Sequence, residues 1–226
     1  MTSFPSQNIQ NAEMKEEFFA KCRELGGNCT TNVPMLEMNG ESYTQSSALI
    51  RHVGRVTGRY KGTYEEDVLI AAVEDLRSAN YKAMRVFGAT DEAVHSYIHD
   101  ILPKHLENFT RLLSVKPGGF YLLGMEPCIA DFGLYDALHV AERQVPGILG
   151  KYARVKLFFD TVEARPAIRG WVDSEQRKKL WAFPSVVTEG KGGGGGHGSI
   201  GWKATTLVTL ATLTALVAAR SFSKRK

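Results

Sequence analysis

Apolar residues recur every three or four positions over most of this chain, which is the spacing of one face of an α-helix. The pattern predicts a short amphipathic helix at 16–25, ended by Gly26-Gly27, and a second helix from Ser46 to about Val56. Longer helices are predicted at 65–87, 91–113, 129–143, 150–164 and 167–179. Most of the fold is therefore expected to be helical.

Residues 33–44 follow a different pattern. Two short runs, VPMLEM and ESYT, flank the dipeptide Asn39-Gly40, which favours a tight turn between antiparallel strands. The sequence therefore predicts a β-hairpin directly before the helix that begins near Ser46. Together these elements define an α+β fold class that is mainly α.

The end of the chain differs in composition from the rest. KGGGGGHGS at 191–199 is a flexible linker, and residues 204–219 then run for 16 positions without a charge. As a helix these residues would span about 24 Å, close to the ~30 Å hydrocarbon core of a bilayer, and Lys203 and Arg220 could reach its two surfaces. A single transmembrane helix is predicted. The alternative, a terminal helix buried against the domain, is disfavoured by the glycine-rich linker.

The net charge of +4 comes from this tail. Six of the 28 basic residues and none of the 24 acidic ones follow Gly190, which leaves 22 basic and 24 acidic residues, about −2, up to that point. The globular part therefore lacks the basic surface of a nucleic-acid-binding protein. Its three cysteines have no spacing typical of disulfides or metal sites, and the N-terminus has no signal-peptide pattern, which favours a reduced cytosolic environment.

Three segments stand out: VPMLEMNGESYTQSSALIRHVGRVTG, FYLLGMEPCIADFGLYDAL and YARVKLFFDTVEARPAIRGWV. Together they resemble the cytosolic glutathione S-transferase family, and its sigma-type, prostaglandin D synthase-like branch in particular. VPMLEMNGESYTQSSALIRHVGRVTG is similar to the glutathione-binding core of that family. FYLLGMEPCIADFGLYDAL resembles its helix-6 signature, and YARVKLFFDTVEARPAIRGWV resembles its final helices. The resemblance covers residues 16–180 and implies a partial thioredoxin-like N-terminal domain followed by an all-helical C-terminal domain.

The resemblance and the composition together predict six regions. They are a disordered leader at 1–15, the partial thioredoxin-like domain at 16–60, the helical domain at 61–186, a Gly-rich linker at 187–202, a transmembrane tail anchor at 203–220 and a basic tail at 221–226.

The family resemblance implies a glutathione-binding site around the hairpin. Pro34 would be a cis-proline that turns the N–H and C=O groups of Val33 toward the cysteinyl part of glutathione; the alternative is an ordinary edge proline. Gln45 and Ser46 stand where a strand passes into a helix, and free N–H groups there would hold the γ-glutamyl carboxylate. The alternative for Ser46 or Ser47 is that it only caps the helix.

Two further pairs gain a meaning from the resemblance. Glu74 and Asp75 fall where sigma-like members place an acid that reaches the ligand of a partner subunit, so a homodimer is expected; the alternative is a solvated acidic turn. Cys128 and Asp131 match a buried capping box with a structural role, in which Ser or Thr usually stands first. Sulfur is the weaker acceptor.

The segment that carries the family's catalytic Tyr, Ser or Cys is not found before the first predicted helix, so an N-terminally truncated member is expected and no catalytic residue is assigned. Cys29 is a conceivable substitute, but no basic residue closely flanks it, which favours an unreactive loop thiol. His95 and His99 share a helix face without a third ligand, so no metal is expected. Glutathione is the expected co-substrate.

Two functions remain open. The first is a membrane-tethered transferase that conjugates lipophilic electrophiles with glutathione, or isomerises them, if the missing segment is supplied. The second is a non-catalytic adaptor similar to the metaxins and the ganglioside-induced-differentiation-associated proteins. The short apolar span and basic end resemble tail anchors of the mitochondrial outer membrane, with the domain facing the cytosol; the endoplasmic reticulum and the peroxisome remain open.

Overall fold

The structure is a computed structural model that describes residues 35–38, 40–84, 88–116, 118–175 and 177, together with positions 16, 20, 23 and 24. The four isolated positions are helical, as the pattern at 16–25 predicts, and Arg23 donates a 2.8 Å hydrogen bond to Glu16. Predictions for Val33, Pro34, Cys29, the Gly-rich linker and the tail anchor lie outside the described residues.

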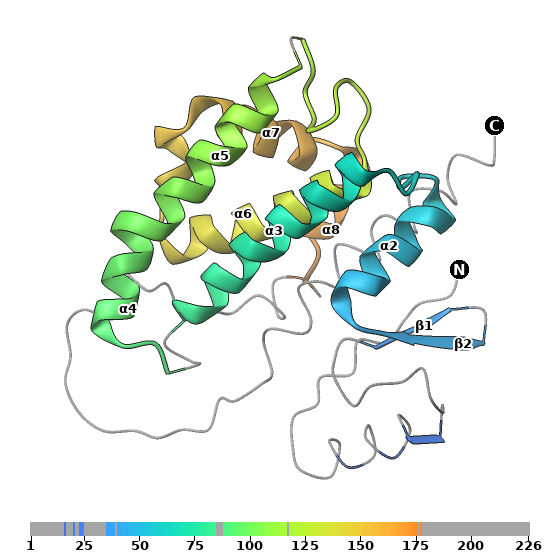
Figure 1. Ribbon diagram of the computed structural model, residues 1–226. Helices are drawn as coiled ribbons and strands as arrows, with labels where there is room; N and C mark the ends of the chain where they lie inside the picture. Colours follow the sequence, from blue (N-terminus) through green and yellow to red (C-terminus); the bar gives the residue numbers. More distant parts are fainter. Residues whose placement is uncertain are drawn as a thin grey trace.

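Two strands and a series of helices make up the described chain (Figure 1). In order they are β1 Met35–Met38, β2 Glu41–Thr44, α2 Ser46–Thr57, α3 Tyr64–Lys82, α4 Asp91–Ser96, the π-helical η2 Tyr97–Ile101, α5 Leu102–Ser114, α6 Ile129–Gln144, the 3₁₀-helical η3 Ile148–Lys151, α7 Ala153–Glu163 and α8 Pro166–Val172. Helices α3 to α8 gather around α6, of whose 16 residues 13 are buried. The hairpin and α2 lie beside this group.

The hairpin is confirmed. β1 and β2 pair antiparallel, with Met35 opposite Thr44 and Met38 opposite Glu41. Gly40 has φ +81°, a left-handed value that glycine adopts without a steric penalty, so the Asn39-Gly40 dipeptide suits the turn. The sheet of the described residues has these two strands. The larger thioredoxin-like domain therefore stays a prediction.

Helix α3 begins where the sequence indicates and ends earlier than predicted. At its start Thr63 Oγ1 accepts the Glu66 N–H at 3.2 Å, and the Glu66 carboxylate accepts the Thr63 N–H at 3.2 Å, which completes a capping box. At its end the Met84 N–H bonds the Tyr81 carbonyl, three residues back, at 3.1 Å. This tighter turn ends the helix at Lys82, so the predicted end at Phe87 was wrong.

The helix predicted at 91–113 contains a π-helical turn, η2, between α4 and α5. Pro103 lies in the first turn of α5. Proline has no N–H for the carbonyl of His99, and its ring would clash with that carbonyl in a regular α-helix. A wider turn relieves the clash, which explains why this long helix is not regular throughout.

The last helix also differs from its prediction. Pro166 stands in the first turn of α8, as expected of proline at a helix start. The helix ends at Val172 rather than at 179, with Asp173 as its C-cap and Ser174 bonded to the Trp171 carbonyl. Ser174 Oγ competes for the carbonyl that a continued helix would use.

Gly54 allows α2 to approach α6 closely. A Cβ built on it would lie 2.6 Å from the Cβ of Tyr60 and 3.1 Å from that of Ile129, closer than packed side chains allow. Gly58 follows α2 with φ +71° and closes it, as predicted.

A buried carboxylate joins the start of α6 to the loop before it. Asp131 is fully buried and accepts the Leu122 N–H through Oδ1 and the Cys128 N–H through Oδ2, both at 2.8 Å. The Asp131 N–H faces the Cys128 sulfur in a capping-box arrangement and also bonds the Cys128 carbonyl at 3.2 Å. Burial raises the pKa of Asp131 to about 6, although both N–H groups favour the charged form.

Across the residues placed by the structure, no helix combines the length and the apolar character needed to cross a membrane. The predicted span at 203–220 is not among those residues.

Candidate functional site

The junction between β2 and α2 has a strained backbone. Gln45, the N-cap of α2, has φ 70° and ψ 109°, and within the described ranges it is the one non-glycine residue with positive φ. Such backbone states cost on the order of 1–3 kcal/mol and persist where the surrounding structure holds them. Here the Gln45 carbonyl is held by the N–H groups of Ala48, at 3.0 Å, and Leu49, at 2.8 Å.

Because Gln45 is the N-cap, the alternative that Ser46 or Ser47 caps the helix was wrong. The Gln45 side chain makes no cap hydrogen bond. The N–H groups of Ser46 and Ser47 lie in the first turn, where no carbonyl one turn earlier can accept them. Ser46 is half-buried and Ser47 is exposed.

The electrostatics of this helix end favour an anion. The first turn of α2 contains no acidic residue, and the helix dipole places partial positive charge there. The pairing of Met35 with Thr44 brings the start of β1 beside the same end. Gln45 and Ser46 thus lie at a junction that can hold a carboxylate, while Val33 and Pro34 immediately precede the described part of β1.

Glu74 and Asp75 lie on α3 in different surroundings. Glu74 is half-buried and accepts a 2.8 Å bond from the buried Arg77, so its carboxylate is held within its own helix. Asp75 is exposed. Burial of His105 on α5 lowers the pKa of that histidine, and the negative charge of Asp75 partly opposes this effect. The prediction that either acid reaches a ligand of a second subunit concerns another chain and stays a prediction.

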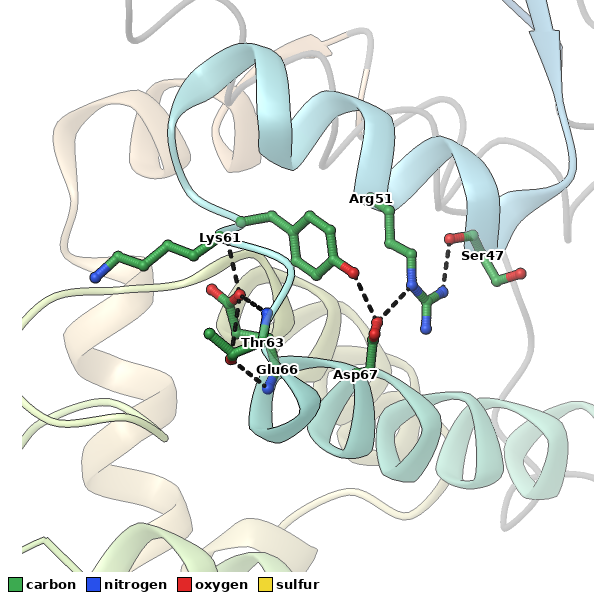
Figure 2. A network of polar contacts seen from close by, with 7 residues as sticks. Ser47, Arg51, Lys61, Thr63, Glu66 and Asp67 are labelled. Carbon is green, nitrogen blue, oxygen red and sulfur yellow. Dashed lines mark hydrogen bonds and ion pairs between the residues drawn. The ribbon is translucent and has the colours of Figure 1, made fainter.

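A polar network that the sequence analysis missed adjoins the start of α2 (Figure 2). Arg51 donates through Nε to Asp67 Oδ1 at 2.8 Å and through a terminal nitrogen to the Ser47 carbonyl at 2.9 Å. The Tyr60 hydroxyl donates to the same Asp67 oxygen at 2.8 Å. Hydrogen bonds from Arg51 and then from Tyr60 lower the pKa of Asp67. Arg51 and Asp67 are 16 residues apart on two helices, so periodicity could not pair them.

Two other described residues bear on whether the site has a catalytic group. The Tyr43 hydroxyl donates to Glu41, and this hydrogen bond is the main reason that the pKa of Tyr43 is raised. The Cys128 thiol is buried, and burial followed by the Asp131 charge raises its pKa. The Tyr43 hydroxyl thus already donates its hydrogen to Glu41, and a raised pKa disfavours the Cys128 thiolate, so neither side chain as placed is suited to activate a thiol or to attack a substrate.

Within the described ranges no group of three or more His, Cys, Asp or Glu residues could hold a metal ion. His95 and His99 lie with their ring centroids 4.4 Å apart on one side of the helix.

The helical part is similar to a known protein family. Residues 74–175 match the family model for the glutathione S-transferase C-terminal domain. Glutathione S-transferase P of Bos taurus is 26% identical over 174 residues, which are 74% of this chain and 83% of that protein.

Solved structures share the fold. A Pi-class glutathione S-transferase of Onchocerca volvulus superposes with a TM-score of 0.61 at 24% identity, over 73% of this chain and 79% of that one. Prostaglandin synthase D of Nilaparvata lugens gives a TM-score of 0.59 at 21% identity, over 73% and 81%.

The chain is therefore glutathione S-transferase-like, and residues 74–175 match the C-terminal domain model of that family. Because both a Pi-class enzyme and a prostaglandin synthase share the fold, the sigma-type branch in particular stays a prediction.

Proposed function

We propose that this chain binds glutathione at the junction of β2 and α2, with the γ-glutamyl carboxylate on the Ser46 hydroxyl and on the N–H groups of Ser46 and Ser47. The observation that carries the proposal is the uncapped start of α2 behind the strained Gln45. A strained residue followed by N–H groups without an intrahelical acceptor, in a first turn that contains no acidic residue, is typical of an anion site.

The reaction that follows from this site is addition of glutathione, through its sulfur and with loss of the thiol proton, to a lipophilic electrophile, or isomerisation with glutathione as co-substrate. Binding would orient the thiol and raise its local concentration at the electrophile. Activation of the thiol requires a group that stabilises the thiolate. No activating residue is assigned among the described side chains, because the Tyr43 hydroxyl already donates to Glu41 and the raised pKa of the buried Cys128 disfavours its thiolate.

Replacing Ser46 by alanine tests the glutathione site. Wild-type protein should be retained on immobilised glutathione, and Ser46→Ala should bind glutathione about 10-fold or more weakly in a calorimetric titration, because a hydrogen bond to a charged group contributes roughly 1.5–3 kcal/mol. Ser47→Ala is the matched control, since it leaves the backbone N–H groups and the Ser46 hydroxyl in place. If folded wild-type protein did not bind glutathione, the adaptor function would be favoured.

We also propose that residues 203–220 anchor the protein in a membrane, with the folded domain in the cytosol. Support comes from the uncharged run at 204–219, its basic flanks and the flexible linker before it. The mitochondrial outer membrane is the first choice because of the short span and the basic end; the endoplasmic reticulum and the peroxisome are the others. An anchor would hold the domain where lipophilic electrophiles concentrate.

Deleting residues 200–226 tests the anchor. The truncated protein should move from the membrane fraction to the soluble fraction and keep the circular dichroism spectrum of a folded helical domain. Deleting only 192–196 shortens the linker without changing the apolar run, so this control should stay in the membrane fraction. A truncated protein that remained membrane-bound would contradict the anchor.

A homodimer is part of the proposal, with Asp75 or Glu74 of one subunit near the ligand of the other. Asp75 suits this role better than Glu74 does. Asp75 is exposed and has no ion-pair partner among the described contacts, whereas Glu74 is paired with Arg77.

A further inference from the structure

We propose that Arg51 is a positioning residue for the glutathione site. Held by Asp67 of α3, it fixes the first turn of α2 and thereby the N–H groups that receive the γ-glutamyl carboxylate. This inference rests on the proposed function. It states that the contact between α2 and α3 controls the geometry of the glutathione site.

The contacts of the Arg51 guanidinium run in two directions (Figure 2). One nitrogen bonds Asp67 on α3 at 2.8 Å, and another bonds the Ser47 carbonyl at 2.9 Å. Arg51 lies four residues after Ser47, so the carbonyl that accepts the helical N–H of Arg51 also accepts its side chain. The guanidinium is planar, and holding both acceptors fixes the peptide unit after Ser47 relative to α3.

The turn that Arg51 holds is the one that presents the free N–H groups. Its other end is fixed by the Gln45 carbonyl, which accepts the N–H groups of Ala48 and Leu49. Ser46 and Ser47 lie between this anchor and the Arg51 contact. A loss of the contact would therefore loosen these two residues first.

Asp67 is itself well placed to act as an anchor. Its Oδ1 also accepts the hydroxyl of Tyr60, which is 7% exposed. Asp67 follows Glu66, whose buried carboxylate accepts the N–H groups of Lys61 at 2.8 Å and Thr63 at 3.2 Å. The start of α3 and the segment before it are thus fixed independently of the Arg51 contact, so α3 can serve as the reference for α2.

The role is geometric more than electrostatic. Asp67 compensates the positive charge of Arg51, and the 2.8 Å ion pair leaves little net charge to attract an anion. A lysine at position 51 would keep the charge and could reach Asp67, but its ammonium on a flexible stem would not hold the two acceptors in the fixed geometry of the planar guanidinium. The number of contacts, rather than the sign of the charge, is expected to decide affinity.

Variants of this pair separate positioning from simple stabilisation. Arg51→Lys should weaken glutathione binding several-fold with little change in melting temperature. The control, Arg111→Lys, changes an exposed arginine on α5 that takes no part in the Asp67 network, and it should bind as wild type does. The double variant Arg51→Asp/Asp67→Arg restores an ion pair between the helices but leaves no side-chain donor for the Ser47 carbonyl. It should regain the melting temperature lost in Arg51→Asp and still bind glutathione about 10-fold more weakly than wild type.

Amide hydrogen exchange without ligand gives a second reading that does not depend on the proposed function. The Ala48 and Leu49 amides should exchange faster in Arg51→Lys and in the double variant than in wild type or Arg111→Lys. If affinity recovered together with melting temperature in the double variant, or if exchange at these amides were unchanged, Arg51 would be only a link between helices. Wild-type protein that did not bind glutathione would overturn the proposed function, and the exchange rates alone would then decide whether Arg51 holds the turn.

Discussion

Replacing Asp131 by alanine is expected to lower the free energy of unfolding by about 4 kcal/mol, because two buried N–H groups lose their acceptor and each costs roughly 1–3 kcal/mol. The N–H groups belong to Leu122 and Cys128, and each lies 2.8 Å from one carboxylate oxygen. The carboxylate therefore joins the loop before α6 to the start of the central helix. Urea denaturation followed by circular dichroism at 222 nm measures the change.

The cysteine in the same capping box provides a control of opposite sign. Cys128→Ser replaces a weak acceptor by a hydroxyl and should stabilise the protein by about 0.5–1 kcal/mol. If the free energy of unfolding of Asp131→Ala were less than about 1 kcal/mol below that of wild type, the two N–H groups would have found other partners.

The same carboxylate gives a pH dependence with a definite sign. Burial raises the pKa of Asp131 from its ordinary 3.8 to about 6, so the folded state binds the proton more tightly than the unfolded state does. This contribution to stability is fully present below pH 3.8 and is lost as pH rises through about 6. The unfolding free energy of wild type minus that of Asp131→Asn should therefore be larger at pH 5 than at pH 7.5. A smaller difference at pH 5 would contradict the assignment.

Replacing Asn80 by alanine has the second largest expected effect, a loss of about 3 kcal/mol from two buried hydrogen bonds and the space that the side chain fills. Asn80 is 1% exposed and joins three elements. Its amide donates to the Ala137 carbonyl of α6 at 2.8 Å, and its oxygen accepts the Tyr97 hydroxyl of η2 at 2.7 Å. Without Asn80 the fully buried Tyr97 hydroxyl would have to find another acceptor.

A double-mutant cycle separates these contributions. Tyr97→Phe alone should destabilise the protein because the Asn80 oxygen loses its donor, whereas Tyr97→Phe in the Asn80→Ala background should cost much less. Thermal or urea unfolding of the four proteins measures the coupling. Additive effects would show that the Tyr97 contact contributes little.

Local chemistry made part of this fold predictable. Asn39-Gly40 supplies the left-handed residue that a tight turn needs, Gly58 supplies the one that ends α2, and Pro166 suits the first turn of α8. In each case the physical cause lies within a few residues of the feature. The sequence pattern was therefore sufficient.

Features that depend on competing local bonds were harder to predict. The apolar pattern of α3 continues past Lys82, but the Met84 N–H turns to a carbonyl three residues back. The same pattern passes through Pro103, and it contains no sign of the wider turn that the proline needs. Periodicity reports which face is buried and is insensitive to such changes in the backbone.

The candidate site contains features that local sequence predicts and features that it does not. The position of Gln45 and Ser46 between strand and helix followed from local pattern and family resemblance, but the positive φ of Gln45 did not. The Arg51–Asp67 pair arises from the packing of two helices, and each residue alone reads as an ordinary exposed charge in the sequence. Tertiary contacts of this kind could not be derived from spacing.

The measurement that tests the central claim most directly is an NMR titration of ¹⁵N-labelled protein with glutathione and, separately, with cysteinylglycine, which lacks the γ-glutamyl carboxylate. Glutathione should shift the amide signals of Ser46 and Ser47 in a saturable manner, and cysteinylglycine at the same concentrations should leave them nearly unchanged. Equal shifts with both compounds, or no shifts at these two amides while the protein remains folded, would contradict a γ-glutamyl site at the start of α2.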